Sequence, residues 1–313
     1  MTTAVLSAMV RPFVEPYLPI DIDVNWFATK AEALEYAPGA EIGWFDLYKR
    51  QDMLPIIHAA TKMKWLNSLY AGVDGLPLDL LADRGVVFTN GAGINAITIA
   101  EYVVMGMLTI AKGYRQVVQA QDRHEWLRIP PGRAELAGSK ALLIGYGAIG
   151  KLIEKRLAAF DVDISKVRRT TGDATTLGPD DWRARLGEFD WIILALPATP
   201  ETEHLIGRPE LDAMKPTATL LNISRGSVID QDALVDALSR RRIAAAFLDV
   251  TTPEPLPPHH SLWTLDNAHI TMHLSGQSQD KMAARAAALF LENLNNYLGG
   301  KPLANVVDLR RGY

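Results

Sequence analysis

The sequence contains no cysteine, so it can form no disulfide and offers no thiolate ligand to a metal. It also lacks an excess of one charge, since 32 basic and 36 acidic side chains leave a formal charge of −4 and a pI near 6.0. That balance gives no reason to expect nucleic acid or an anionic membrane as a partner. No stretch reaches the roughly 18 uninterrupted apolar residues of a membrane span, and residues 1–10 lack the basic segment of a signal peptide. We expect a cytoplasmic protein that acts on a small molecule.

Apolar residues are plentiful, at 48% of 313 residues, which is ordinary for a globular protein and too many for a disordered one. A chain of this length exceeds the usual size of a single core, so two domains are expected. One long domain is the alternative.

Short apolar runs alternate with helical spacing along most of the chain, which is typical of parallel α/β folds. In the first hundred residues the runs predict strands at 4–10, 42–45, 65–69 and 86–88, with a helix at 76–82. A second series predicts a doubly wound sheet, with strands at 141–144, 164–167, 191–196, 218–223, 245–248 and 269–272 and helices at 149–160 and 231–240. Residues 100–126 predict one long helix between the domains, and residues 281–298 a C-terminal helix that crosses back to the first.

A glycine-rich turn opens the second series. The run Gly145-Tyr146-Gly147-Ala148-Ile149-Gly150 follows an apolar strand and begins a helix, which is the context of a dinucleotide-binding fingerprint. The first glycine permits the tight turn, the second lets backbone N–H groups approach a pyrophosphate, and the third lets helix and strand pack closely. A turn without a ligand is the alternative.

Two arginines stand where such folds usually carry an acidic residue, about 20 positions further on. Arg168 and Arg169 follow the second strand of the series. A carboxylate there would repel a 2′-phosphate, whereas a guanidinium binds it, so the pair favours NADP over NAD. The alternative is a solvated strand end.

Three later segments bring chemical groups to predicted strand ends, where open α/β sheets bind their ligands. They are Asn222–Gly226, Asp249–Pro255 and His269–His273, which contribute an arginine, a glutamate and a histidine. Taken singly, Arg225 could be a surface charge, Glu254 a loop carboxylate and His273 a core histidine. Together they form a set suited to catalysis.

With these motifs in this order, the chain resembles the D-isomer-specific 2-hydroxyacid dehydrogenase family, from roughly Gly72 to Gly276. The resemblance rests on the glycine turn, Leu196-Pro197 before Thr199–Thr202, Asn222–Asp230, Leu248–Leu256 and His273 with Ser275-Gly276 behind it. It implies a Rossmann doubly wound sheet at 99–280 and a smaller flavodoxin-like α/β substrate domain built from 1–98 and 281–313. The chemistry would take place in the cleft between them, and relatives pair through the Rossmann domain, which implies a homodimer.

The resemblance also implies roles for the three strand-end groups. Arg225 would pair with the substrate carboxylate and polarise the 2-oxo group. His273 would exchange a proton with the substrate oxygen as hydride moves to or from C2. Glu254 would hold the imidazole and raise its pKa, which keeps the acid form populated.

The remaining assignments concern binding. Ala71 and Gly72 would present backbone N–H groups to the substrate carboxylate, beside Arg225 and His273. Thr98 would border the nicotinamide and Asp249 would contact its carboxamide, although a first-turn hydroxyl and a turn-capping aspartate are the alternatives. The cofactor set further includes Gly145, Tyr146, Gly147, Ala148, Ile149, Gly150, Arg168, Arg169, Leu196, Pro197, Thr202 and Ile223. No metal site is predicted, because the pair His259-His260 has no further ligands at suitable spacing.

These assignments describe an oxidoreductase that prefers NADP(H), with NAD(H) possible, and that reduces small 2-oxo acids to D-2-hydroxy acids. Among relatives, the Arg168-Arg169 pair most resembles the sequence found in NADPH-dependent glyoxylate and hydroxypyruvate reductases. A dinucleotide-sensing corepressor or scaffold of the same fold is the alternative from another class, and retention of the three catalytic groups argues against it. A formate-type dehydrogenase is not expected, since those relatives have glutamine where this chain has Glu254. Met272 stands where many relatives have proline, and Trp44, Phe45 and Tyr70 are either pocket or core residues.

Overall fold

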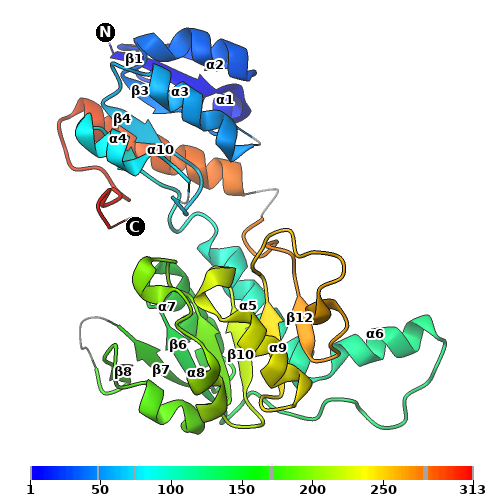
Figure 1. Ribbon diagram of the computed structural model, residues 1–313. Coiled ribbons are helices and arrows are strands. Elements are labelled where there is room, and N and C mark those ends of the chain that lie inside the picture. Colours follow the sequence, from blue (N-terminus) through cyan, green and yellow to red (C-terminus); the bar gives the residue numbers. More distant parts are fainter. Residues whose placement is uncertain (1, 48, 74, 169–172, 278–280, 312–313) are drawn as a thin grey trace. The chain divides into compact units, whose positions relative to one another are not determined.

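The computed structural model describes residues 2–47, 49–73, 75–168, 173–277 and 281–311 (Figure 1). The chain divides into two compact units. The first joins Met1–Asn95 to Ser278–Tyr313, and the second is Ala96–Gln277.

The first unit is built on a five-stranded parallel sheet in the order β2-β1-β3-β4-β5. This is the 2-1-3-4-5 order of flavodoxin-like folds. The strands are β1 Thr2–Ser7, β2 Ile22–Phe27, β3 Ile42–Trp44, β4 Trp65–Asn67 and β5 Val87–Thr89. The helices are α1 Arg11–Val14, α2 Lys30–Tyr36, α3 Met53–Ala59, α4 Leu78–Asp83 and α10 Met282–Leu298.

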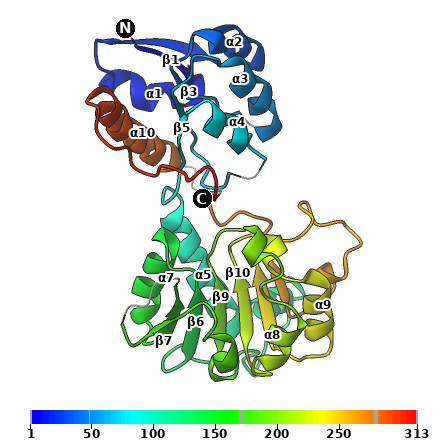
Figure 2. The ribbon, with the colours of Figure 1, turned by 60° about the vertical axis from the view of Figure 1, so that its left-hand side comes forward.

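Helices cover both faces of this sheet, as Figure 2 shows. Apolar residues of α2, α3 and α4 form one core cluster, and α10 packs with α1 in the other. The ring centroid of Phe290 in α10 lies 4.9 Å from that of Trp44 and 5.2 Å from that of Trp65. Trp44 and Phe45 are fully buried, so they belong to the core.

The second unit has a seven-stranded parallel sheet in the order β12-β11-β10-β9-β6-β7-β8. Counted from β6, this is the 3-2-1-4-5-6 order of the Rossmann fold with one strand added. The strands are β6 Lys140–Ile144, β7 Asp163–Val167, β8 Thr176–Leu177, β9 Trp191–Leu194, β10 Thr219–Asn222, β11 Ala245–Leu248 and β12 Ala268–Ile270. The predicted fold class, a Rossmann sheet with a smaller flavodoxin-like α/β domain, is confirmed.

Helices also cover both faces of the second sheet (Figure 2). Residues of α5 and α7 pack on one face, and residues of α8 and α9 on the other. The bounds are α5 Ala96–Ala111, α6 Tyr114–Asp122, α7 Ala148–Ala158, α8 Arg208–Ala213 and α9 Gln231–Ser239. The strands are buried on both sides and therefore read as continuous apolar runs.

The prediction of one long helix over residues 100–126 is wrong. Helix α5 ends at Ala111, and α6 begins at Tyr114 after a bend of 69°. Gly113 adopts a left-handed conformation with φ of 60° at the bend, and an added Cβ would lie 2.7 Å from the backbone of Gly132. The glycine therefore allows the chain to turn against a later segment. Among the described residues no single helix is long and apolar enough to cross a membrane; only the bent pair α5 and α6 passes that test of length and composition.

Some element ends also differ from the predictions, and two strands were not predicted. The run at 4–10 is a strand only to Ser7, because a 3-10 turn at Ala8–Val10 leads into α1 with its proline at position 12. Edge strand β2 was not predicted, because its apolar residues alternate with polar Asp23 and Asn25 while the predictions rested on continuous apolar runs. The two-residue strand β8 is too short to leave a pattern in the sequence.

Candidate active site

The glycine turn lies between β6 and α7, at the point where the strand order reverses. Gly145 has φ of +100°, and a Cβ there would lie 2.3 Å from the carbonyl oxygen of Ala195. A Cβ on Gly150 would lie 2.5 Å from the carbonyl oxygen of Gly145, whereas one on Gly147 would meet nothing within 4 Å. Gly145 and Gly150 therefore serve packing, and Gly147 faces open space where a ligand can approach.

Helix α7 supplies the donors for that space. The first backbone hydrogen bond of the helix runs from the N–H of Lys151 to the carbonyl of Gly147. Helix geometry leaves the N–H groups of Ala148, Ile149 and Gly150 without partners inside the helix. Together with the helix dipole, these donors form a site suited to phosphate.

Basic residues lie at the end of β7, the strand that follows α7 in the sequence. Arg168 is exposed, and its guanidinium lies over the ring of Tyr146, while Arg169 is outside the described residues. Lys166 was not predicted as a site residue; it is buried and pairs with Glu154 of α7 at 2.7 Å. The available signal was a lysine inside the predicted strand at 164–167, next to apolar Val167.

The strands beyond the switch point end in linked turns. The hydroxyl of Thr202 donates to the carbonyl of Pro197 at 2.9 Å, and the hydroxyl of Ser224 donates to the carbonyl of Leu196 at 2.7 Å. Ile223 lies at the end of β10 and is buried. The predicted residues Leu196, Pro197, Thr202 and Ile223 thus lie in neighbouring turns of one sheet edge.

The turn of Arg225 presses against the loop that carries Glu254. A Cβ on Gly226 would lie 2.1 Å from the backbone of Thr251, so only glycine permits this approach. Asn222 fixes the turn by donating to the carbonyl of Arg225 at 2.9 Å and accepting from the N–H of Ser224 at 3.0 Å. Two segments that are 25 residues apart in the sequence are therefore held together.

His273 and Glu254 form a direct pair. The Nδ1 atom of His273 lies 2.8 Å from Oε2 of Glu254, and the other carboxylate oxygen accepts the N–H of Thr251 at 3.2 Å. The side chains are 47% and 37% exposed, so the imidazole is supported from one side and open to reactants on the other.

This pair shifts both pKa values. The hydrogen bond from Glu254 raises the pKa of His273 above its ordinary value, against burial and the positive charge of Arg225, which lower it. Burial acts to raise the pKa of Glu254, but the hydrogen bond and charge of His273, with smaller contributions that include Arg225, leave it lowered. An ionised carboxylate beside an imidazole that holds its proton to higher pH is an arrangement for proton donation.

Asp249 is buried beneath this histidine at 2% exposure. Its carboxylate accepts the hydroxyl of Thr271 at 2.7 Å, the N–H groups of Leu274 and Ser275 at 3.0 and 3.1 Å, and the hydroxyl of Ser275. The turn it closes includes His273, which has a positive φ of 57°. The turn-capping alternative for Asp249 is thus observed, while its contact with a nicotinamide stays a prediction.

Three predicted residues belong to other elements. Thr98 is in the first turn of α5. Ala71 and Gly72 are in a turn of the first unit. The hydrogen bonds that hold this segment were not predicted from the sequence. Asn90 donates to the carbonyl of Ala71 at 2.6 Å, and buried Asp46 accepts the hydroxyl of Ser68 at 2.8 Å and the N–H of Leu69.

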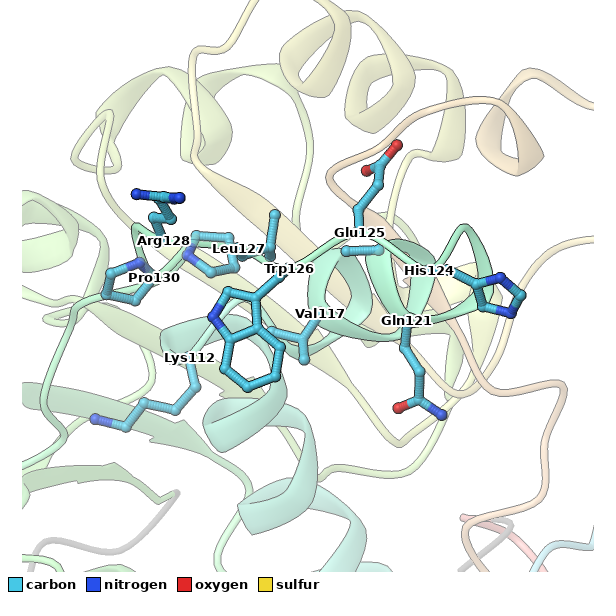
Figure 3. Close-up of a pocket in the computed structure, with 11 residues that line it drawn as sticks. Lys112, Val117, Gln121, His124, Glu125, Trp126, Leu127, Arg128 and Pro130 are labelled. Carbon is cyan, nitrogen blue, oxygen red and sulfur yellow. The ribbon is translucent and has the colours of Figure 1, made fainter.

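A separate hollow lies elsewhere in the second unit. It measures about 650 Å³ and is formed by α6 and the segment after it (Figure 3). Trp126, which is 93% exposed, lies beside Val117 and Leu127 there. None of its lining residues is a predicted site residue. Over the described part of the chain, no cluster of three or more His, Asp or Glu side chains is arranged to hold a metal.

A phosphate-binding turn at the switch point of a Rossmann sheet, with an arginine, a glutamate and a histidine at later strand ends, defines a dinucleotide-dependent oxidoreductase fold. The chain belongs to the D-isomer specific 2-hydroxyacid dehydrogenase family. Residues 104–275 match the family model described as "D-isomer specific 2-hydroxyacid dehydrogenase, NAD binding domain".

Known proteins agree with this membership. The chain is 31% identical over 300 residues to the D-3-phosphoglycerate dehydrogenase of Methanocaldococcus jannaschii, covering 92% of this chain but only 56% of that protein. It is 32% identical over 265 residues to the human glyoxylate reductase/hydroxypyruvate reductase, covering 80% and 79% of the two chains. A D-isomer specific 2-hydroxyacid dehydrogenase from Xanthobacter autotrophicus Py2, solved with NADPH and MES, superposes with a TM-score of 0.79 at 25% identity over 100% and 99% of the two chains.

Proposed function

We propose that this protein is an NADP-preferring reductase that converts small 2-oxo acids, of the size of glyoxylate and hydroxypyruvate, into D-2-hydroxy acids. The observation that carries the proposal is the 2.8 Å contact between His273 and Glu254, with the charge of Arg225 acting on both. The similarity to the human glyoxylate/hydroxypyruvate reductase supports the substrate class.

The residues present fit a nicotinamide dinucleotide. The open space at Gly147 and the N–H groups of Ala148, Ile149 and Gly150 would hold the pyrophosphate. Arg168 would meet the 2′-phosphate, and the NADPH complex of the Xanthobacter relative supports that preference. The turns at Leu196, Pro197, Thr202 and Ile223, together with Thr98 and Asp249, would line the rest of the site.

NADPH, when bound, supplies the hydride that adds to C2 of the substrate. His273 gives its proton from Nε2 to the carbonyl oxygen, since Nδ1 is engaged with Glu254. Arg225 binds the carboxylate and stabilises the negative charge that develops on the oxygen. By the family resemblance, backbone N–H groups of Ala71 and Gly72 would be further donors for the carboxylate. One hydride and one proton thus turn the C=O bond into CH–OH, and His273 takes up a proton from solvent afterwards.

The test is an initial-rate assay at 340 nm with NADPH and with NADH, over glyoxylate, hydroxypyruvate, pyruvate and phenylpyruvate. 3-Phospho-D-glycerate is included in the oxidative direction, because the archaeal relative is named for it. We expect turnover of the small 2-oxo acids with NADPH preferred. His273→Ala should lower kcat by about 10²- to 10⁴-fold, whereas His259→Ala, in an exposed loop, should not change it.

Two results would contradict the proposal. Turnover that survives in His273→Ala would remove the histidine from the chemistry. Tight NADPH binding without turnover of any substrate would favour the sensor alternative, in which partner binding depends on cofactor and not on His273.

We further propose a homodimer formed through the Rossmann unit, as the family resemblance implies. The exposed apolar side chains of Trp126, Leu127 and Ile129 support an interface at this segment.

A further inference from the structure

The ring of Tyr146, at the second position of the glycine turn, lies beside two cations. The ring centroid is 4.8 Å from Nζ of Lys166 and 5.4 Å from Cζ of Arg168. Both distances are within the roughly 6 Å over which a cation is attracted to an aromatic ring. Lys166 and Arg168 are two positions apart along an extended segment, so they project from the same side of it.

The two cations differ in what surrounds them. Lys166 is 9% exposed and pairs with Glu154 at 2.7 Å and Asp173 at 3.1 Å. The hydroxyl of Tyr146 donates to the same Glu154, which fixes the direction of the ring. The charge of Lys166 is therefore compensated inside the protein, whereas Arg168 is exposed at the strand end.

We propose that Tyr146 is a specificity-determining residue, whose ring holds the guanidinium of Arg168 in position to bind the 2′-phosphate of the cofactor. This inference rests on the proposed NADP preference. A free arginine at a surface samples many rotamers and loses that freedom when it binds an anion. A guanidinium already stacked on a ring loses less, so the ring contributes to affinity for the phosphorylated ribose without touching the phosphate.

The turn that binds the pyrophosphate and the residue that reads the 2′-phosphate are thereby coupled through one side chain. The ion pair of Lys166 with Glu154 and the hydrogen bond from Tyr146 to Glu154 hold the ring, and the ring contacts Arg168. Tyr146→Phe keeps the ring and loses the hydroxyl contact, whereas Tyr146→Leu loses both. The two variants separate stacking from the hydrogen bond.

Calorimetric titration with adenosine 2′,5′-bisphosphate and with AMP tests this without turnover. Tyr146→Leu should weaken binding of the 2′-phosphorylated probe by about two- to fivefold, the range of a cation–π contact at an exposed site. The loss should be smaller for AMP, which lacks only the 2′-phosphate, and Tyr146→Phe should lie between wild type and the leucine variant. In an Arg168→Gln background, Tyr146→Leu should have no further effect, since the cycle measures their coupling.

Circular dichroism checks that each variant is folded, and Tyr146→Met replaces the leucine variant if that one is not. Equal weakening of both probes, or the same loss with and without Arg168, would overturn the inference and leave Tyr146 a packing residue. A wild-type protein that binds AMP as tightly as the 2′-phosphorylated probe would instead contradict the NADP preference, and the inference with it.

Discussion

At the scale of single residues, opposite charges act on the imidazole of His273. Glu254 stabilises the protonated ring through a 2.8 Å hydrogen bond, and Arg225 disfavours it through its positive charge. The hydrogen bond is the larger influence, so the pKa of the histidine is raised. Without Glu254, the arginine proposed to bind the substrate carboxylate would weaken the histidine proposed as the acid.

A pH profile tests this balance. In the proposed mechanism, reduction requires protonated His273, so the rate should fall as pH rises through its raised pKa. Glu254→Gln removes the charge and most of the support, so the pKa falls and the decline in kcat/KM should move to lower pH. We expect kcat at neutral pH to drop about 10- to 100-fold, as for loss of a residue that orients a reacting group. An unmoved profile would contradict the coupling of the two residues.

At the scale of elements, the glycine turn combines two requirements in one short segment. Gly145 and Gly150 allow the strand and helix to approach each other closely, and Gly147 leaves the helix N-terminus open. The same sequence motif therefore serves folding at its ends and ligand access in its middle.

Alanine substitutions should separate these requirements. Gly145→Ala forces a Cβ to within 2.3 Å of a carbonyl at a φ of +100°, and it should lower the free energy of unfolding by about 2–4 kcal/mol. Gly147→Ala meets no atom within 4 Å and should leave stability within about 0.5 kcal/mol. It should instead weaken NADPH binding, because its Cβ occupies the approach to the pyrophosphate. Urea denaturation and fluorescence titration measure the two effects, and a similar loss of stability in both variants would contradict this division.

At the scale of the whole molecule, the chain forms two units that each complete an α/β sheet with helices on both faces. The segment after α5 departs from this plan, since it exposes Trp126 at 93% and Ile129 at 67%. Large apolar side chains gathered on a surface are costly to leave in water. A second copy that covers them is the physical basis of the proposed homodimer.

Sedimentation velocity tests the dimer at micromolar concentration. Trp126→Glu should shift the protein toward monomer, because a carboxylate cannot be buried unpaired at an apolar interface. Ile20→Glu is the matched control, since Ile20 is 94% exposed in the other unit and should leave the oligomeric state unchanged. A monomeric wild type, or a Trp126→Glu variant that sediments as wild type does, would contradict an interface at this segment.

The sequence by itself determined what depends on local order along the chain. The apolar runs, their spacing and the glycine turn predicted both sheets except for strands β2 and β8, because strand, turn and helix are each a contiguous pattern. The strand-end positions of Arg225, Glu254 and His273 followed from the same pattern.

The tertiary structure decided what depends on residues far apart in the sequence. The bend at Gly113 packs against Gly132, and the carboxylate of Asp249 closes the turn of His273. The charge of Lys166 is paired with Glu154 of α7. Each involves side chains or backbone groups that meet only when elements pack, and periodicity carries no information about such partners. For the same reason, burial rather than residue type assigned Trp44 and Phe45 to the core.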